Sequence, residues 1–121
     1  MIEAFKKKVI DASSNDEFRF YVKCDDCGKC FYSIPITFSC RGAPVTTEGK
    51  KIIYSLLREK EYQLVYEKAL RQLIQNFSEC PMCRKWVCDE CFCICDEIDL
   101  CEECVKNLGE NGLKVSEKQG D

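Results

Sequence analysis

The chain has 121 residues, carries a formal net charge of −3, and contains 12 cysteines but no histidine. The lack of histidine excludes Ser/His and Cys/His nucleophilic catalysis and any imidazole-bound metal. The acidic balance disfavours nucleic acid as a partner, because proteins that neutralise many phosphates usually carry the opposite sign.

The compartment decides what the cysteines do. The first ten residues lack the apolar run of ~7 residues that a signal peptide needs. No stretch approaches the ~18 apolar residues of a membrane span. We therefore expect a cytoplasmic protein with no membrane partner, in which structural disulfides do not persist and metal binding is the leading interpretation.

Residues 1–16 are predicted to form a short amphipathic helix that closes with turn-forming residues. The apolar residues at helical spacing are Ile2, Phe5, Val9 and Ala12. From Glu17 the apolar period changes to two, and it resumes after the cysteine pair at 24 and 27. We therefore expect strand, knuckle and strand over residues 17–40, the outline of half a zinc ribbon.

Residues 46–77 are predicted to be a helical insertion, which Thr46 or Thr47 can cap. Its apolar residues form two stripes whose centres differ by roughly 100°, which predicts a bend or break near Arg58–Glu61. Such stripes indicate core packing, with a partner-binding or dimerising face as the alternative.

The cysteine-rich knuckles occupy residues 78–108, and residues 109–121 are predicted to form a flexible tail. These elements predict one α+β domain over residues 1–108. It would be a small zinc-stabilised domain, with zinc-ribbon or treble-clef hairpins and the long helical insertion.

Four Cys-x-x-Cys pairs carry the chemistry. This spacing lets both sulfurs of a pair face one metal ion at about 2.3 Å, and four thiolates complete a tetrahedron. The eight predicted ligands are Cys24, Cys27, Cys80, Cys83, Cys88, Cys91, Cys101 and Cys104. We expect them to hold at least two structural Zn²⁺ ions, since a site of four thiolates leaves no open position for catalysis.

The four-residue link between Cys83 and Cys88 indicates that the two middle pairs serve different ions. Two partitions remain open. In tandem ribbons the first pair joins the second and the third joins the fourth. In a cross-brace the first pair joins the third and the second joins the fourth.

The segment from Cys80 to Cys91, CPMCRKWVCDEC, resembles the middle of treble-clef cross-brace modules such as FYVE domains. Phe77-Ser78-Glu79 stands where that family has a basic, His-rich phosphoinositide motif, so lipid recognition is not carried over. The knuckles at Cys24–Gly28 and Cys80–Cys83 resemble those of zinc ribbons and rubredoxins, and the arrangement is similar to uncharacterised bacterial cysteine-rich proteins.

Four cysteines lie outside the pairs and could be free thiols or hold a third zinc ion. They are Cys30, Cys40, Cys93 and Cys95. Cys40 continues the apolar alternation of its strand, so we expect a buried free thiol there. Cys93 or Cys95 could also replace Cys91 as a ligand.

These features predict a structural zinc protein, not an enzyme, that acts as an interaction module for another macromolecule, most simply a protein. Trp86 would be its anchor if exposed, and packing beside the knuckles is the alternative. The acidic pairs inside two knuckles, Asp25/Asp26 and Glu102/Glu103, are expected to be solvated spacers, and no small-molecule substrate is evident.

The sequence leaves two alternative functions open. A rubredoxin-like iron centre for electron transfer would use Cys24, Cys27, Cys80 and Cys83, since iron accepts the same tetrahedral sulfur set. A nucleic-acid-binding zinc ribbon would require short basic runs such as Lys6-Lys7-Lys8 to cluster. We expect zinc rather than iron in the centres, and the acidic net charge disfavours binding to nucleic acid.

Overall fold

The structure is a computed structural model that describes residues 2–95, 97–109 and 112–114. Contacts within the chain define two compact units. The first, here called the helical unit, comprises residues 2–22 and 32–73. The second, the cysteine unit, comprises residues 23–31 and the described residues from Ile74 onward. The two units therefore alternate along the sequence, and residues 32–73 of the helical unit lie between the two segments of the cysteine unit.

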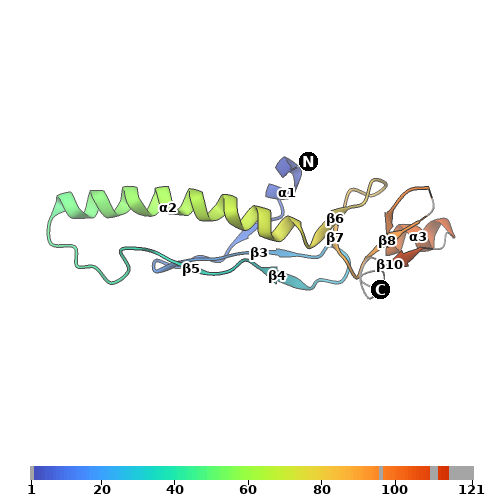
Figure 1. Ribbon diagram of the computed structural model, residues 1–121, viewed down its shortest axis with the longest axis horizontal. Coiled ribbons are helices and arrows are strands. Elements are labelled where there is room, and N and C mark those ends of the chain that lie inside the picture. The colour runs from blue at the N-terminus through green and yellow to red at the C-terminus, as the bar shows by residue number, and fades with distance from the viewer. Residues whose placement is uncertain (1, 96, 110–111, 115–121) are drawn as a thin grey trace. The chain divides into compact units, whose positions relative to one another are not determined.

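The helical unit contains one long helix and several short antiparallel strands (Figure 1). Strand β1 pairs with β3, which is hydrogen-bonded on its other side to β4, and β2 pairs separately with β5. The chain passes between the two units in β3 and β4. The elements are α1 (Ile2–Lys6), β1 (Ile10–Asp11), β2 (Glu17–Phe18), β3 (Phe20–Lys23), β4 (Cys30–Tyr32), β5 (Ile36–Thr37) and α2 (Glu48–Ile74).

The helix predicted over residues 1–16 is limited to α1, which ends at Lys6. The next residues of the expected helix form β1, which pairs with β3 in the register Ile10 to Tyr21. The Ser13 hydroxyl accepts a hydrogen bond from the Arg19 amide at 2.9 Å. Serine side chains that bind backbone groups in this way compete with helix formation, so the polar turn ends the helical pattern early.

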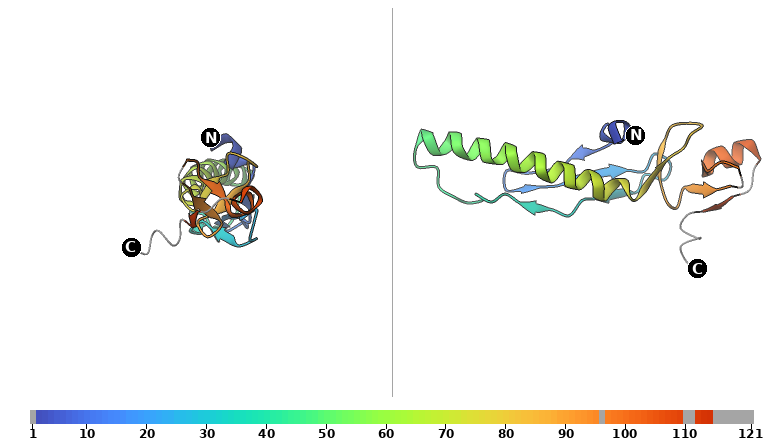
Figure 2. Two further views of the ribbon diagram at one scale, coloured as in Figure 1. Left: turned by 90° about the vertical axis from the view of Figure 1, so that its right-hand side faces the viewer. Right: turned by 45° about the horizontal axis from the view of Figure 1, so that its top comes forward.

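Helix α2 runs unbroken from Glu48 to Ile74, as Figure 1 and the turned views of Figure 2 show. Thr47 caps it, since its Oγ1 accepts a hydrogen bond from the Lys50 amide at 3.1 Å. The predicted bend near Arg58–Glu61 is wrong. Only the second apolar stripe is packed, through Val65, Ala69, Leu70 and Leu73, whereas the first is exposed, so one straight helix satisfies the packing.

The core of the helical unit is aromatic. Phe18 and Phe20 are fully buried, and each makes an edge-to-face contact with Tyr62 at ring-centroid distances of 6.0 and 5.4 Å. The buried Ser33 hydroxyl accepts a hydrogen bond from the Phe20 amide at 3.0 Å, and the Ser33 amide donates to the Phe20 carbonyl at 2.8 Å. This pair of bonds joins the two strand segments that cover α2.

The cysteine unit is built from short hairpins and one short helix. Strand β6 pairs with β7, and β8 lies between β9 and β10. The elements are β6 (Phe77–Glu79), β7 (Trp86–Cys88), β8 (Phe92–Ile94), β9 (Leu100–Cys101), α3 (Glu102–Leu108) and β10 (Leu113–Lys114). Three helices and several short antiparallel sheets in the described residues make this a small mixed α and β protein.

The predicted flexible tail over residues 109–121 falls mostly outside the described residues. Within the described part, Gly109 ends α3 in the left-handed conformation with φ of 70°, and Leu113–Lys114 form β10 on the edge of β8. Among the described helices, none combines the length and the apolar character needed to cross a membrane.

Candidate metal centres

The first centre brings together Cys24, Cys27, Cys88 and Cys91, whose sulfur atoms all lie within 4.8 Å of one another. Cys24 and Cys27 come from the loop between β3 and β4, Cys88 ends β7, and Cys91 precedes β8. The sulfur of Cys88 lies 3.7 Å from that of Cys27 and 3.9 Å from that of Cys91. Four thiols from three separate parts of the cysteine unit therefore converge on one point.

The second centre brings together Cys80, Cys83, Cys101 and Cys104 under the same 4.8 Å limit. Cys80 and Cys83 lie in the loop between β6 and β7, Cys101 ends β9, and Cys104 lies in the first turn of α3. The sulfurs of Cys80 and Cys104 are 3.7 Å apart, and those of Cys83 and Cys101 are 3.6 Å apart.

These sulfur–sulfur distances fit a tetrahedral ion. Metal–sulfur bonds of about 2.3 Å in a regular tetrahedron place the sulfurs about 3.8 Å apart. A disulfide would require about 2.05 Å, and none of the twelve cysteines is joined to another in a disulfide. Each centre can therefore hold one tetrahedrally coordinated cation on four thiolates.

The first knuckle is shaped by its backbone. The Gly28 amide donates to the Cys24 carbonyl at 3.0 Å, and the Cys24 amide donates to the Lys29 carbonyl at 2.9 Å. Gly28 has a φ of 77°, the left-handed conformation that glycine adopts without steric cost. The turn aims both sulfurs of the pair in one direction.

The second knuckle repeats this pattern with a different residue at the strained position. The Arg84 amide donates to the Cys80 carbonyl at 2.8 Å, and the Cys80 amide donates to the Lys85 carbonyl at 2.9 Å. Arg84 has a φ of 65°, the only positive φ at a described residue other than glycine. This conformation is sterically unfavourable for a residue other than glycine. The surrounding structure must therefore hold the backbone of the knuckle in place.

One cysteine in each centre has a lowered pKa, which favours its thiolate form. Burial raises the pKa of Cys24, but hydrogen bonds from backbone amides, including that of Cys88 at 3.3 Å, outweigh burial and lower it to about 7. Cys80 accepts the corresponding hydrogen bond from the Cys101 amide at 3.4 Å. Burial raises the pKa of Cys80 too, but the backbone hydrogen bonds outweigh burial and lower it to about 6.

The other buried thiols of each centre resist ionisation without a cation. Burial, together with neighbouring thiol groups, raises the pKa of Cys88 and of Cys104 to about 11 and raises those of Cys91 and Cys101 further. A divalent cation at the centre would reverse this, because it stabilises every thiolate around it. Each cluster thus combines one cysteine of lowered pKa with others of raised pKa, and the latter would ionise only around a bound cation.

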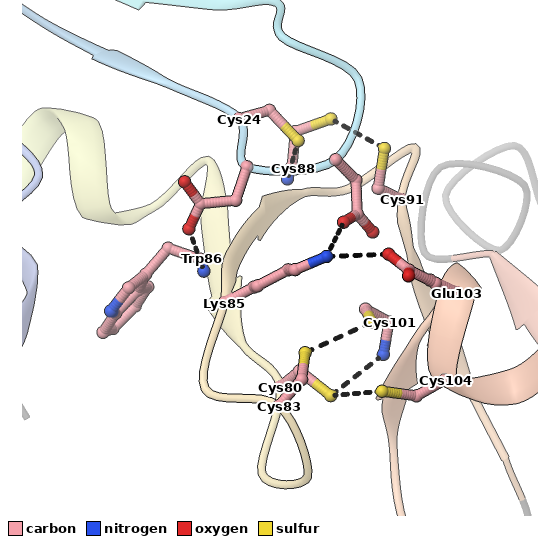
Figure 3. Close-up of polar contacts among 12 residues, drawn as sticks. Cys24, Cys80, Cys83, Lys85, Trp86, Cys88, Cys91, Cys101, Glu103 and Cys104 are labelled. Atoms are coloured by element: carbon pink, nitrogen blue, oxygen red, sulfur yellow. Dashed lines mark hydrogen bonds and ion pairs between the residues drawn. The ribbon is translucent and has the colours of Figure 1, made fainter. Parts of the chain in front are cut away.

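Lys85 connects the loops of the two centres (Figure 3). Its Nζ lies 2.7 Å from Glu103 Oε2, within the last cysteine pair, and 3.4 Å from Asp26 Oδ1, within the first pair. Hydrogen bonds to Glu103 and then Asp26 raise the pKa of Lys85, and Lys85 lowers the pKa of Glu103. An ion on four thiolates leaves a net negative charge, so a lysine between two such centres is electrostatically favourable.

Asp25 and Glu103 are exposed, as expected of solvated spacers, but the acidic residues of both pairs also make contacts that the sequence did not indicate. Asp26 and Glu103 bind Lys85, and Asp25 Oδ2 accepts a hydrogen bond from the Trp86 amide at 2.9 Å. Glu102 forms an ion pair with Lys106 on the surface of α3, 3.2 Å apart. Sequence reasoning missed Lys85, although it lies in the short link between two cysteine pairs.

The order of the cysteines follows the cross-brace alternative: the first pair joins the third, and the second joins the fourth. The tandem arrangement does not occur. The set proposed for a rubredoxin-like iron centre, Cys24 and Cys27 with Cys80 and Cys83, is likewise divided between two clusters. The reason is the β6–β7 hairpin, in which β7 carries Cys88 away from the knuckle that contains Cys83.

The remaining four cysteines lie outside these clusters. Cys30 is exposed on β4, Cys40 is half-buried in the helical unit, Cys93 is buried on β8 and Cys95 is half-buried after it. In the part of the chain that the structure describes, none of them joins a group of Cys or acidic residues that could hold an ion. The predicted third site is not assembled there, and Cys91, rather than Cys93 or Cys95, completes the first centre.

Trp86 is only 3% exposed, so the prediction of an exposed anchor is wrong and the packing alternative holds. Its carbonyl accepts a hydrogen bond from the Asp25 amide at 3.1 Å, which ties β7 to the first knuckle. Its side chain lines a cavity of the cysteine unit together with Phe77 and Phe92.

These features define a cysteine-rich protein with two tetracysteine sites, each able to bind a metal ion in a structural role. The arrangement is consistent with a zinc-ribbon-like domain. Comparison with protein-family models, with curated proteins and with solved structures finds no match to the chain.

Proposed function

We propose that this protein is a structural zinc protein whose two tetrathiolate centres form a cross-brace related to treble-clef modules. The observation that carries the proposal is the interleaved convergence of eight cysteine sulfurs into two sets of four, at tetrahedral spacing. Four thiolates without an open position suit a structural ion. We therefore assign no catalytic reaction to either centre.

Zinc is the preferred ion because it has no geometric preference of its own and binds four thiolates tetrahedrally. Iron accepts the same ligand set, so the sulfur atoms alone do not separate the two metals. Zinc would also explain the placement of the centres within a unit of very short strands. Structural zinc sites contribute on the order of 10 kcal/mol of apparent binding free energy, which such a unit needs in place of a large core.

The scaffold held by the ions is proposed to serve interaction with another protein. The acidic net charge supports a protein partner over nucleic acid, and the exposed apolar half of α2 offers a surface for one. A reducing compartment such as the cytoplasm is proposed because eight thiolates must stay reduced to bind metal.

Metal analysis of the protein purified without added metal tests the proposal. We expect colourless protein with about two zinc ions per chain. Cys88→Ser should lower the zinc content, whereas Cys30→Ser, an exposed cysteine outside both clusters, should leave it unchanged. Red protein with visible charge-transfer absorption would identify iron instead, and metal-free folded protein would refute a metal role altogether.

A further inference from the structure

The first half of α2 presents an apolar face that nothing in the helical unit covers. From Glu48 to Leu64 no residue is buried, although this stretch contains large apolar side chains. Those side chains are between 36% and 62% exposed. They are Ile52, Ile53, Leu56, Leu57 and Leu64.

A line of residues on this face follows the spacing of a coiled coil. Successive members are separated alternately by three and four positions, the pattern of heptad core positions. We call this line the seam, and its residues are Lys50, Ile53, Leu57, Lys60, Leu64 and Glu67. At 100° per residue, the apolar part of the seam points roughly 150° away from Val65, Ala69 and Leu73, which pack into the unit.

The seam therefore lies almost opposite the packed face, where a second helix can approach without displacing the core. A helix this exposed gains little stability from propensity alone, because helical stability comes mainly from packing of an apolar face. An apolar stripe on a helix of a folded protein indicates a partner surface when it is continuous. Here the apolar members of the seam run from Ile53 to Leu64 over about three turns, with Lys60 among them.

The charges on the seam select the partner and its direction. If a second copy of α2 pairs in the opposite direction with Ile53 facing Leu64, then Leu57 faces Lys60 at the centre. In the same register Lys50 of each copy faces Glu67 of the other, so an ion pair lies at each end of the paired stretch. Lys60 can lay its aliphatic stem over Leu57 and keep its ammonium group in water.

A parallel pairing in register would instead place like residues together. Lys50 would face Lys50, Lys60 would face Lys60, and Glu67 would face Glu67, which is repulsive at three levels. The seam is thus self-complementary in the antiparallel direction alone. This property distinguishes a second copy from an unrelated helix, which would need a matching charge pattern of its own.

We propose that the protein forms a homodimer through an antiparallel pairing of α2, with the seam as the interface. The paired stretch from Lys50 to Glu67 is about 26 Å long at 1.5 Å per residue. This is shorter than most permanent interfaces, so the dimer exchanges with the monomer in a concentration-dependent way. The inference is independent of the metal centres, because every residue it uses lies in the helical unit.

Sedimentation equilibrium of the full, metal-loaded chain over a concentration series tests the proposal. The wild type should show a monomer–dimer equilibrium. Lys50→Glu or Glu67→Lys replaces both ion pairs by repulsive pairs and should weaken the dimer by roughly tenfold or more. The double variant Lys50→Glu/Glu67→Lys should recover wild-type affinity, and an equimolar mixture of the two single variants should form a heterodimer.

Ile53→Asp and Ile52→Asp form a matched pair on the same helix. Both remove an exposed isoleucine, but only Ile53 belongs to the seam. Ile53→Asp should abolish the dimer and Ile52→Asp should retain it, with equal helix content by circular dichroism. Equal effects of the two variants would overturn the seam as the interface.

The other outcomes also decide the matter. A wild-type chain that stays monomeric at all concentrations would overturn self-pairing and leave the face to a different protein. Undiminished association of both Lys50→Glu and Glu67→Lys would overturn the antiparallel direction, since in a parallel pair each change only exchanges one like-charge pair for another. Unchanged zinc content in every variant would keep these results separate from the metal proposal.

Discussion

The cross-brace makes a quantitative prediction about which cysteines share an ion. Two variants can each replace four cysteines by serine. The first removes the whole first centre: Cys24, Cys27, Cys88 and Cys91. The second removes the first two pairs in sequence: Cys24, Cys27, Cys80 and Cys83. The number of thiols lost is the same, but the structure assigns them to one centre in the first variant and to two in the second.

The expected zinc contents follow from the number of sulfurs left at each centre. The first variant keeps one complete tetrahedron, and the second keeps two half-centres of two sulfurs each. A full structural site is worth ~10–16 kcal/mol, so a half-site that retains half of this falls to ~5–8 kcal/mol, a micromolar or weaker dissociation constant. A mild chelator would strip the half-sites and spare the complete one.

The assay is metal quantitation per chain after dialysis against such a chelator. We expect about two zinc ions for the wild type, about one for the first variant and nearly none for the second. A count of free thiols by alkylation would show the same cysteines becoming reactive. The reverse result, with one ion in the second variant and none in the first, would indicate tandem ribbons and refute the pairing.

Three further predictions address the residues that support these sites and the helical unit. Ser33→Ala leaves the buried Phe20 amide without its acceptor and should lower the free energy of unfolding by about 1–3 kcal/mol in a denaturant titration, and a loss within error would contradict that role. Burial, then the hydrogen bond and charge of Asp11, raises the pKa of Tyr62 to about 12, so the stability linked to this tyrosine is present below pH 10 and is lost as the pH rises through 12. Asp11→Asn should shift the tyrosinate absorbance titration to lower pH, and an unshifted curve would exclude the contact. Gly28→Ala and Gly42→Ala both place alanine at a positive φ, which costs about 1 kcal/mol of stability. Only Gly28→Ala should speed the loss of zinc to a chelator. Equal rates of zinc loss would show that the first knuckle does not depend on glycine.

The long helix could be predicted from sequence because its cap and its periodicity are local properties. Thr47 and the apolar repeat fixed its extent to within a few residues. The bend was not predictable, because a repeat shows which residues share a face but not which face is packed. The stripe of Ile52 and Leu56 resembles a buried one in sequence and differs from it only in having no neighbour in the unit.

The eight cysteines of the centres could be predicted from the sequence, but which pairs share a centre could not. Four residues between Cys83 and Cys88 separate the middle pairs, but the choice between tandem and crossed partners depends on the path of β7 and β8 in space. The contacts of Lys85 and Asp26 were missed for the same reason. They are 59 residues apart, and no local pattern marks an ion pair at that separation.

Because the cysteine pairs are interleaved, the two centres close loops of different length. Cys27 and Cys88 are 61 positions apart, whereas Cys83 and Cys101 are 18 apart. Closing the longer loop costs about 1 kcal/mol more chain entropy if the intervening segment is disordered. That segment contains residues 32–73 of the helical unit, whose own folding shortens the flexible loop that the ion must close. Folding of the insertion is thus expected to favour metal capture at the first centre, whereas the second can close without it.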